Sequence, residues 1–136
     1  MPRRFSVDEY RRMAELGVLA EDDRVELLEG VITPKMTHNP PHDSVVALLE
    51  HAIRPLLPAG WSLRIQSSVT TADSEPEPDV AIVRGGPREF MQRHPGGADV
   101  ACVVEASEAS LERDRTKRRL YARAAVPIYW IVNLVD

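Results

Sequence analysis

The sequence predicts a single α/β domain, residues 1–136, in which helices flank one β-sheet. Its length of 136 residues is typical of one domain. Segments with the apolar spacing of helices alternate with segments that resemble strands, which is the pattern of a sheet with helices packed on it. The hydrophobic fraction of 43% is sufficient for one core, and no internal repeat or low-complexity segment interrupts the pattern.

Helices are indicated by capping residues and apolar spacing. Ser6 and Glu9 form an S-x-x-E capping box at the start of the first helix, and Gly17 ends it. Asn39 is the expected N-cap of the second helix, and the third helix is expected over residues 111–125. The positions expected to face the core are Val45, Leu48, Leu49, Ala52, Ile53 and Leu56 of the second helix, and Leu111, Leu120, Ala124 and Ala125 of the third.

Strands are expected between these helices. The apolar runs DVAIV and VACVVE are typical of buried central strands, and the glycine- and proline-bearing segment between them is expected to be a loop. The first strand carries a turn-like Gly30 near its end. The strands are expected over residues 25–32, 61–70, 79–83, 100–105 and 126–135.

A carboxylate stands at the edge of each of the two central strands. Asp79 opens DVAIV and Glu105 closes VACVVE. A carboxylate beside an apolar strand is costly unless it is paired or binds a metal. Two converging carboxylates favour a hard divalent cation such as Mg²⁺, which takes oxygen ligands. From the spacing alone, the alternative is that each acid only ends its strand and faces water.

The third helix is rich in basic residues. The segment ERDRTKRRLYAR holds six basic side chains against two acidic ones. Such a surface either faces solvent or faces phosphate groups. Lys117 and Tyr121 are four residues apart, so both project from the same face of the helix.

Several motifs in order resemble the Uma-type restriction endonuclease family. They are EPDVAIV at 77–83, VVEAS at 103–107 and DRTKRRLYARAAVPIYWIV at 114–132, preceded by VELLEGVI and by PPHDSVV. The resemblance runs from about Phe5 to the end of the chain. That family is placed in the PD-(D/E)xK nuclease superfamily, so the resemblance implies a restriction-endonuclease-like mixed β-sheet flanked by helices.

The resemblance also implies an active site. Asp79 matches the aspartate of the PD motif, and Glu105 matches the second acid; together they would hold Mg²⁺ or Mn²⁺. Lys117 matches the lysine that this family carries on the following helix, and Glu26 matches a further active-site acid. Accessory positions are His42 and Tyr121, and the arginines expected to contact the nucleic-acid backbone are Arg113, Arg115 and Arg118.

This chain departs from the family's pattern at several positions. Ser107 stands where the superfamily usually has its lysine, and Lys117 comes three positions after Asp114 where the family usually has an offset of four. Ile128 replaces a common acid. Relatives usually continue with further strands, so the domain is expected to be either truncated at its C-terminal end or naturally short.

The favoured hypothesis is a metal-dependent endonuclease that hydrolyses phosphodiester bonds of DNA. A nuclease-like fold that serves as a non-catalytic binding or assembly module is the alternative, favoured by the missing lysine at Ser107 and by the net charge of −4. A hydrolase of a small phosphorylated ligand is a third hypothesis. A homodimer is expected by analogy, because the two strands of duplex DNA are related by two-fold symmetry.

The remaining features favour a cytoplasmic protein. The N-terminus lacks a secretory signal, no apolar stretch is long enough to span a membrane, and the single Cys102 cannot form an intramolecular disulfide. The pair His38 and His42 has a spacing seen in zinc sites, but two intervening prolines exclude a regular helix turn, so no zinc site is proposed. Tyr129 and Trp130 are expected in the core or in a dimer contact.

Overall fold

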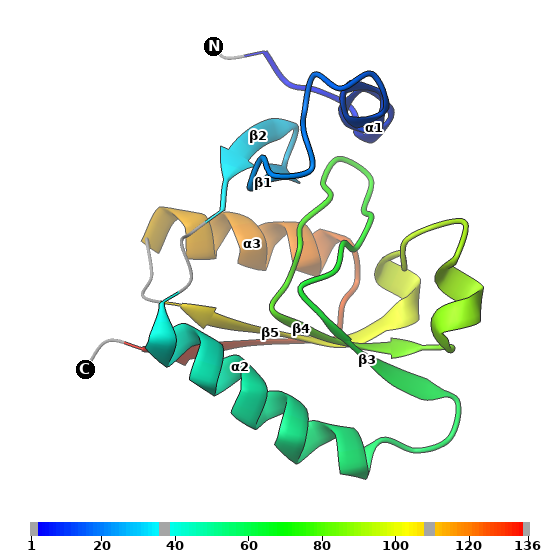
Figure 1. The fold of residues 1–136 in the computed structure, drawn as a ribbon, viewed down its shortest axis with the longest axis vertical. Coiled ribbons are helices and arrows are strands. Elements are labelled where there is room, and N and C mark those ends of the chain that lie inside the picture. Colours follow the sequence, from blue (N-terminus) through cyan, green and yellow to red (C-terminus); the bar gives the residue numbers. More distant parts are fainter. Residues whose placement is uncertain (1–2, 36–38, 108–110, 135–136) are drawn as a thin grey trace.

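A computed structural model describes residues 3–35, 39–107 and 111–134, without the side chains of 111 and 112. His38 of the predicted histidine pair lies outside these residues. Figure 1 shows the elements in chain order. They are α1 (Val7–Glu15), β1 (Val25–Leu28), β2 (Val31–Pro34), α2 (Pro40–Ile53), η1 (Arg54–Leu56), β3 (Trp61–Ile65), β4 (Val80–Arg84), η2 (Pro87–Phe90), η3 (Gly97–Asp99), β5 (Val100–Ser107), α3 (Leu111–Arg123) and β6 (Ile128–Asn133).

The main sheet has the strand order β3-β4-β5-β6 within the described residues. β4 pairs antiparallel with both β3 and β5, whereas β6 pairs parallel with β5. A parallel pair needs a crossover connection, and α3 supplies it between β5 and β6. The sheet is therefore mixed and flanked by helices, which confirms the predicted fold class.

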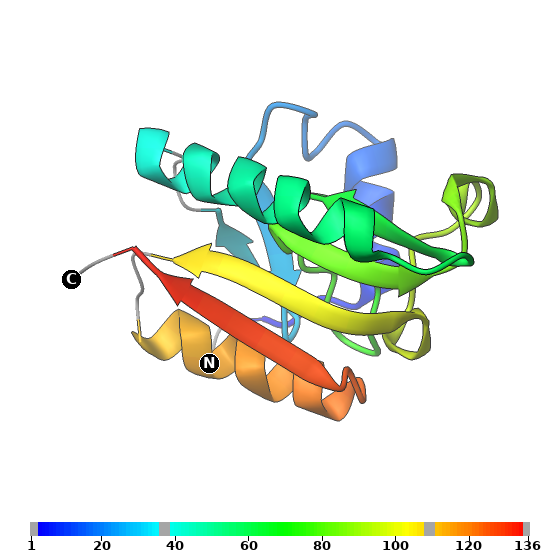
Figure 2. The same cartoon turned by 90° about the horizontal axis from the view of Figure 1, so that it is seen from below.

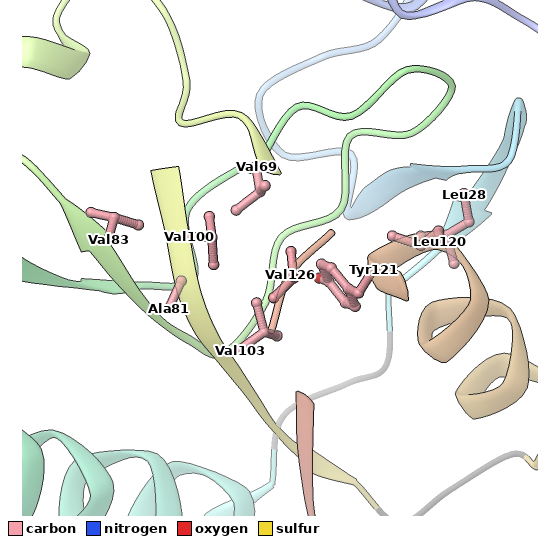
Figure 3. Packing of buried hydrophobic residues seen from close by; sticks show 9 residues of the cluster. All are labelled: Leu28, Val69, Ala81, Val83, Val100, Val103, Leu120, Tyr121 and Val126. Carbon is pink, nitrogen blue, oxygen red and sulfur yellow. The ribbon is translucent and has the colours of Figure 1, made fainter. Parts of the chain in front are cut away.

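The two faces of the sheet are covered by different helices. α2 lies on one face, while α3, the β1–β2 hairpin and α1 lie on the other (Figures 1 and 2). Strand alternation divides the core accordingly: Val80 and Val104 pack with Val46 of α2, whereas Ala81 and Val103 belong to the cluster under α3. Figure 3 shows the second cluster, which contains Leu28, Val69, Ala81, Val83, Val100, Val103, Leu120, Tyr121 and Val126.

The predicted strand over residues 25–32 is wrong, because the chain reverses within it. β1 and β2 form an antiparallel hairpin joined by Glu29 and Gly30, with φ angles of 50° and 81°. Two positive φ angles in succession are the signature of a tight hairpin turn whose twist matches its strands. Glycine adopts this conformation without strain, so Gly30 is the turn itself and not a feature near a strand end.

Gly30→Ala is expected to destabilise the fold by about 2 kcal/mol or more, because strain and a clash add together. A Cβ atom at Gly30 would lie 2.8 Å from Arg4 Cβ and 3.2 Å from the Phe5 carbonyl oxygen. Gly60 is a matched control, with φ of 89° and nothing within 4 Å of the position that a Cβ atom would take. Gly60→Ala should cost only about 1 kcal/mol. Urea unfolding of both variants checks the difference, and equal losses would contradict the role of the Arg4 contact.

The second helix faces the sheet with part of the predicted set: Val45, Leu49 and Ile53 pack against the core, whereas Leu48, Ala52 and Leu56 do not. Leu48 and Leu56 are 68% and 80% exposed, whereas His42 and Val46 are buried. The helix ends at Ile53, and a 3₁₀ turn containing Pro55 follows, so Leu56 leaves the helical phase. His42 therefore sits on the buried face of α2.

Other boundaries differ in ways that have local causes. β3 ends at Ile65 because Gln66 has a φ of 50°, which breaks the extended chain, and Val69 is buried in the connection that follows. The predicted capping box of α1 is confirmed, with Ser6 Oγ accepting from Glu9 N at 3.0 Å. Within the described part of the chain, no helix has both the length and the apolar character needed to cross a membrane.

Candidate active site

The two predicted carboxylates face each other across neighbouring strands. Val80 pairs with Val104, and the antiparallel register continued by one residue sets Asp79 opposite Glu105. Both have the same parity as Ala81 and Val103, so they lie on the α3 face of the sheet. Asp79 is 5% exposed and Glu105 is 6% exposed. The alternative in which each acid faces water is therefore wrong.

Asp79 is held by two hydrogen-bonding groups from different elements. Its Oδ2 accepts a hydrogen bond from the backbone N–H of Ala106 at 2.9 Å. Its Oδ1 lies 3.1 Å from Nε2 of His42. The first contact joins β4 to the end of β5, and the second joins the start of α2 to the sheet. These contacts fix the orientation of the carboxylate.

Lys117 lies between two buried carboxylates. Its Nζ is 3.1 Å from Glu105 Oε1 and 3.4 Å from Glu26 Oε2. Glu26 comes from β1, and its Oε1 accepts a hydrogen bond from the Glu77 backbone N–H at 3.0 Å. The structure thus brings Asp79, Glu105, Lys117 and Glu26 together from four elements. The shorter spacing before Lys117 does not keep the ammonium group away from the acids.

The charges of this cluster are strongly coupled. Burial raises the pKa of Glu105 to about 8; Lys117 opposes this shift, while Asp79 and Glu26 add to it. Burial also disfavours the ammonium of Lys117, but the carboxylates of Glu105 and Glu26 outweigh it and raise the pKa of Lys117 above its usual value. Two buried carboxyl groups therefore share Lys117, and the buried carboxyl group of Asp79 lies beside them.

These side chains line a pocket of about 60 Å³, which we call the acid pocket. A water molecule needs roughly 10–15 Å³ on the same scale, so the acid pocket holds a few water molecules or a hydrated ion and not a nucleotide. Its lining consists of Glu26, Lys35, Asn39, His42, Glu77, Asp79, Glu105, Ala106, Ser107, Arg113, Asp114, Lys117 and Leu134.

Sequence reasoning missed three charged residues of this lining. Glu77 lies two residues before Asp79, and strand-like alternation could have identified it as a neighbour on the same side. Asp114 lies three residues before Lys117 on α3, where helical spacing carried the same information. Lys35, whose Nζ is 3.2 Å from Glu77 Oε1, had no signal because it follows a hairpin that was not recognised.

The arginines of α3 do not act as one surface. Arg113 lines the acid pocket and donates to the Pro34 carbonyl oxygen at 2.7 Å. Arg115 and Arg118 are exposed and lie outside the lining of the acid pocket. Arg119 and Arg123 form ion pairs with Glu29 of the hairpin turn.

Comparison with known proteins shows which family the chain belongs to. The family model Uma2, described as "Putative restriction endonuclease", matches residues 7–136. The chain belongs to the Uma2 family. This confirms the family resemblance carried by the sequence motifs, and no curated protein matches.

A solved structure shares the Uma2 fold. It is described as a "putative nuclease belonging to DUF820" from Anabaena variabilis ATCC 29413. It matches with a TM-score of 0.68 at 15% sequence identity, covering 97% of this chain and 74% of that chain. The family's description supports a nuclease function, and the solved structure supports the fold.

The buried acids around Lys117 have the oxygen ligands that a divalent cation prefers. Their side chains are not already arranged around an ion position. Among the described residues, no group of three or more histidine, cysteine, aspartate or glutamate side chains could hold an ion as it stands. Mg²⁺ typically uses only one or two carboxylates and keeps several waters or takes substrate oxygens. Asp79 and Glu105 supply two carboxylates, and the excess negative charge around Lys117 favours a cation.

Tyr121 lies in the core of this Uma2 chain. It is fully buried, its ring centroid is 5.2 Å from that of Tyr129, and it is absent from the lining of the acid pocket. Its accessory role stays a prediction. Trp130 is 57% exposed on β6 and is not a core residue, whereas Cys102 is buried as expected of a small core side chain.

Proposed function

We propose that this chain is a divalent-cation-dependent endonuclease that hydrolyses phosphodiester bonds of DNA. The observation that carries the proposal is the convergence of Asp79 and Glu105 with the buried Lys117 at one pocket. A structural role alone gives no reason to bury the carboxyl groups of Asp79, Glu105 and Glu26 close together, because burying charged groups is costly even when they are paired. Perturbed titratable groups in a cleft are typical of functional sites.

Mg²⁺ or Mn²⁺ would be held by Asp79, Glu105 and the backbone carbonyl of Ala106. A cation bound there supplies Lewis acidity toward a phosphate oxygen and lowers the pKa of bound water. His42 and the Ala106 N–H keep the Asp79 carboxylate in position. Lys117 would orient the attacking water and stabilise negative charge that builds on the phosphate oxygens.

Other charged residues of the pocket lining have separate roles in this proposal. Glu26 holds Lys117 together with Glu105 and would serve as the further acid. Arg113 and Lys35 stand in the lining as cations that can contact a phosphate. Because the pocket is small, the substrate presents one phosphate to it and stays largely outside, as a polynucleotide does. A homodimer stays a prediction.

Plasmid nicking tests the proposal. Supercoiled plasmid is incubated with the protein and Mg²⁺ or Mn²⁺, and the relaxed and linear products are quantified. The wild type should nick and the Asp79→Ala/Glu105→Ala variant should not. A wild type that is inert across cations, salt and pH, or a double variant that cuts equally well, contradicts the enzymatic proposal.

A non-catalytic binding or assembly module is the second candidate. It is favoured by the occupation of Asp79 and Glu105 by protein partners and by the lack of a preformed ion cage among the described residues. Thermal unfolding with added Mn²⁺ separates the two. A metal site stabilises the folded state as the cation concentration rises above its Kd, whereas a scaffold shows no shift.

Mn²⁺ is expected to bind more tightly as pH rises from 6 to 8. Burial raises the pKa of Glu105 to about 8, so below that pH a cation must displace a proton from this carboxyl group. The affinity should increase by up to about tenfold per pH unit, with release of about one proton per ion. Isothermal titration in buffers of different ionisation enthalpy measures both. Glu105→Gln is the control, and a wild-type affinity that is flat over this range contradicts the role of Glu105 as a ligand.

A further inference from the structure

A second depression lies beside the acid pocket, between the β1–β2 hairpin and α3. We call it the hairpin groove. Its lining is Arg4, Leu28, Glu29, Val31, Thr33, Arg113, Thr116 and Arg119. Arg113 lines both the acid pocket and the hairpin groove, so the two depressions meet at this side chain.

The two depressions have opposite charge. The hairpin groove carries three arginines against one glutamate. The acid pocket carries five carboxylic side chains against two lysines and one arginine. In a chain with a net charge of −4, a groove with excess positive charge is a local feature and not the average of the surface. A cation-binding centre with an adjoining basic groove matches a substrate that carries a row of phosphates.

The size of the hairpin groove also suits such a substrate. Its volume is about 410 Å³, against about 60 Å³ for the acid pocket. Pockets that hold organic ligands span roughly 300–1,000 Å³, so the groove accommodates a nucleotide unit and the acid pocket does not. One phosphate would sit at the acid pocket while the strand beside it lies in the groove.

The walls of the hairpin groove are held together by the hairpin turn. Arg119 Nε donates to Glu29 Oε2 at 2.8 Å, and Arg4 donates to the Glu29 backbone oxygen. A guanidinium carries five N–H donors, so each arginine keeps donors beyond these contacts. The hydroxyl group of Thr116 on α3 adds a donor, whereas the Thr33 hydroxyl on β2 donates to the Val31 carbonyl oxygen at 3.1 Å and offers the groove an acceptor.

We propose that the hairpin groove binds the sugar–phosphate backbone of the DNA strand that flanks the phosphate at the acid pocket. This inference rests on the proposed nuclease function. It names the path of the strand: from the acid pocket past Arg113, between β2 and α3, toward Arg4. The contacts are to phosphates, so they position the strand without reading its sequence. The alternative path crosses the exposed Arg115 and Arg118 instead.

Binding of fluorescein-labelled single-stranded and duplex oligonucleotides, followed by anisotropy without divalent cations, tests the groove separately from cleavage. Arg4→Gln removes a charge from the groove, and Thr116→Glu places a negative charge in it. Arg118→Gln and Arg115→Gln are matched controls that remove the same charge from outside the groove. Circular dichroism melting verifies that each variant is folded.

Arg4→Gln should lower the slope of log affinity against log salt by about one. It should also reduce by roughly fourfold the loss of affinity between 50 and 200 mM salt. Thr116→Glu should weaken binding at least as much as Arg4→Gln. The two control variants should keep the slope of the wild type.

Several outcomes would overturn the proposal that the hairpin groove binds DNA. They are groove variants that bind like the wild type, controls that lose as much as Arg4→Gln, or a wild type that binds neither oligonucleotide. A protein that binds through the groove but never nicks plasmid removes the nuclease proposal and leaves the binding surface standing. A protein that nicks plasmid but is insensitive to the groove variants removes only the groove.

Discussion

Replacing Lys117 by methionine is expected to lower the free energy of unfolding by about 3 kcal/mol at pH 8. Lys117 is 7% exposed, and its Nζ lies within 3.4 Å of both Glu105 and Glu26. Methionine fills a similar volume but leaves two buried carboxyl groups without their cation. Breaking one side of a buried ion pair costs more than the pair contributes, because the remaining charge stays desolvated.

The loss should depend on pH with a defined sign. Burial already raises the pKa of Glu105 from 4.5 to about 8, and removing Lys117 takes away the charge that opposes this shift. A raised folded-state pKa gives stability that is present below pH 4.5 and is lost as pH rises through the folded pKa. The Lys117→Met variant should therefore be close to the wild type at pH 5 and increasingly less stable toward pH 9.

Two further variants identify the cause of this loss. Lys35→Met makes the same substitution in the lining of the same pocket, where Lys35 and Glu77 keep 17% and 27% exposure and the pair contributes at most about 1 kcal/mol. The double variant Lys117→Met/Glu105→Gln removes one of the buried carboxyl groups that the loss of Lys117 leaves unpaired. It should recover part of the lost free energy of unfolding, as a double-mutant cycle would show. Urea unfolding at pH 5, 7 and 9 measures all of them. A loss independent of pH would indicate lost packing and not unpaired charge.

The sequence was sufficient for the part of the site that depends on strands. Asp79 and Glu105 end two apolar runs, and alternation plus antiparallel pairing makes such ends meet. Lys117 could be expected from the family resemblance, but its distance to the acids depends on how the loop before α3 absorbs a shorter spacing. Only the three-dimensional packing of α3 on β5 decides that distance.

The rest depended on contacts that local patterns do not encode. Gly30 was expected only as a turn-like residue near a strand end. The hairpin that it forms places Lys35 in the lining of the acid pocket and forms one wall of the hairpin groove. His42 was expected as an accessory residue, and the predicted buried face of α2 wrongly included Leu48, which is exposed. The helix turned its polar His42 inward because Asp79 is there to receive it. His42 has the same helical phase as Val45, Leu49 and Ile53, so the apolar spacing and the Asp79 contact favour the same face of α2.

The ion-pair partners of the α3 arginines were also not predictable from local sequence. Composition alone predicts a basic helix, and it cannot say that Arg119 and Arg123 pair with Glu29, which is distant in the chain. These pairs reduce the free positive charge on one side of α3 and fasten the hairpin to it. A count of basic residues therefore overstates the phosphate-facing surface, which is why the location of each arginine decides the proposed path of DNA.

Glu105→Gln should abolish plasmid nicking while making the cation-free protein more stable at pH 8. Loss of a metal ligand and of the charge it supplies should reduce cleavage by at least about 100-fold. Burial raises the pKa of Glu105 to about 8, which means that the charged carboxylate destabilises the folded state. Removing this charge should therefore stabilise the protein. Glutamine has the same shape without that charge, its amide oxygen can still accept from Lys117, and Glu26 at 3.4 Å remains as the counter-charge of the ammonium. We expect a gain on the order of 1 kcal/mol.

Asp79→Asn provides the contrast that makes this pair of effects informative. Asp79 accepts from the Ala106 N–H and faces His42, so its carboxylate is satisfied by the protein. Asparagine would disturb these contacts, and we expect it to lose both cleavage and about 1–2 kcal/mol of stability. Urea unfolding and plasmid nicking on the same preparations measure both quantities. If Glu105→Gln also destabilises the cation-free protein, Glu105 is a structural partner of Lys117; if it stabilises the protein and abolishes cleavage, the fold tolerates an unfavourable charge that only the reaction requires.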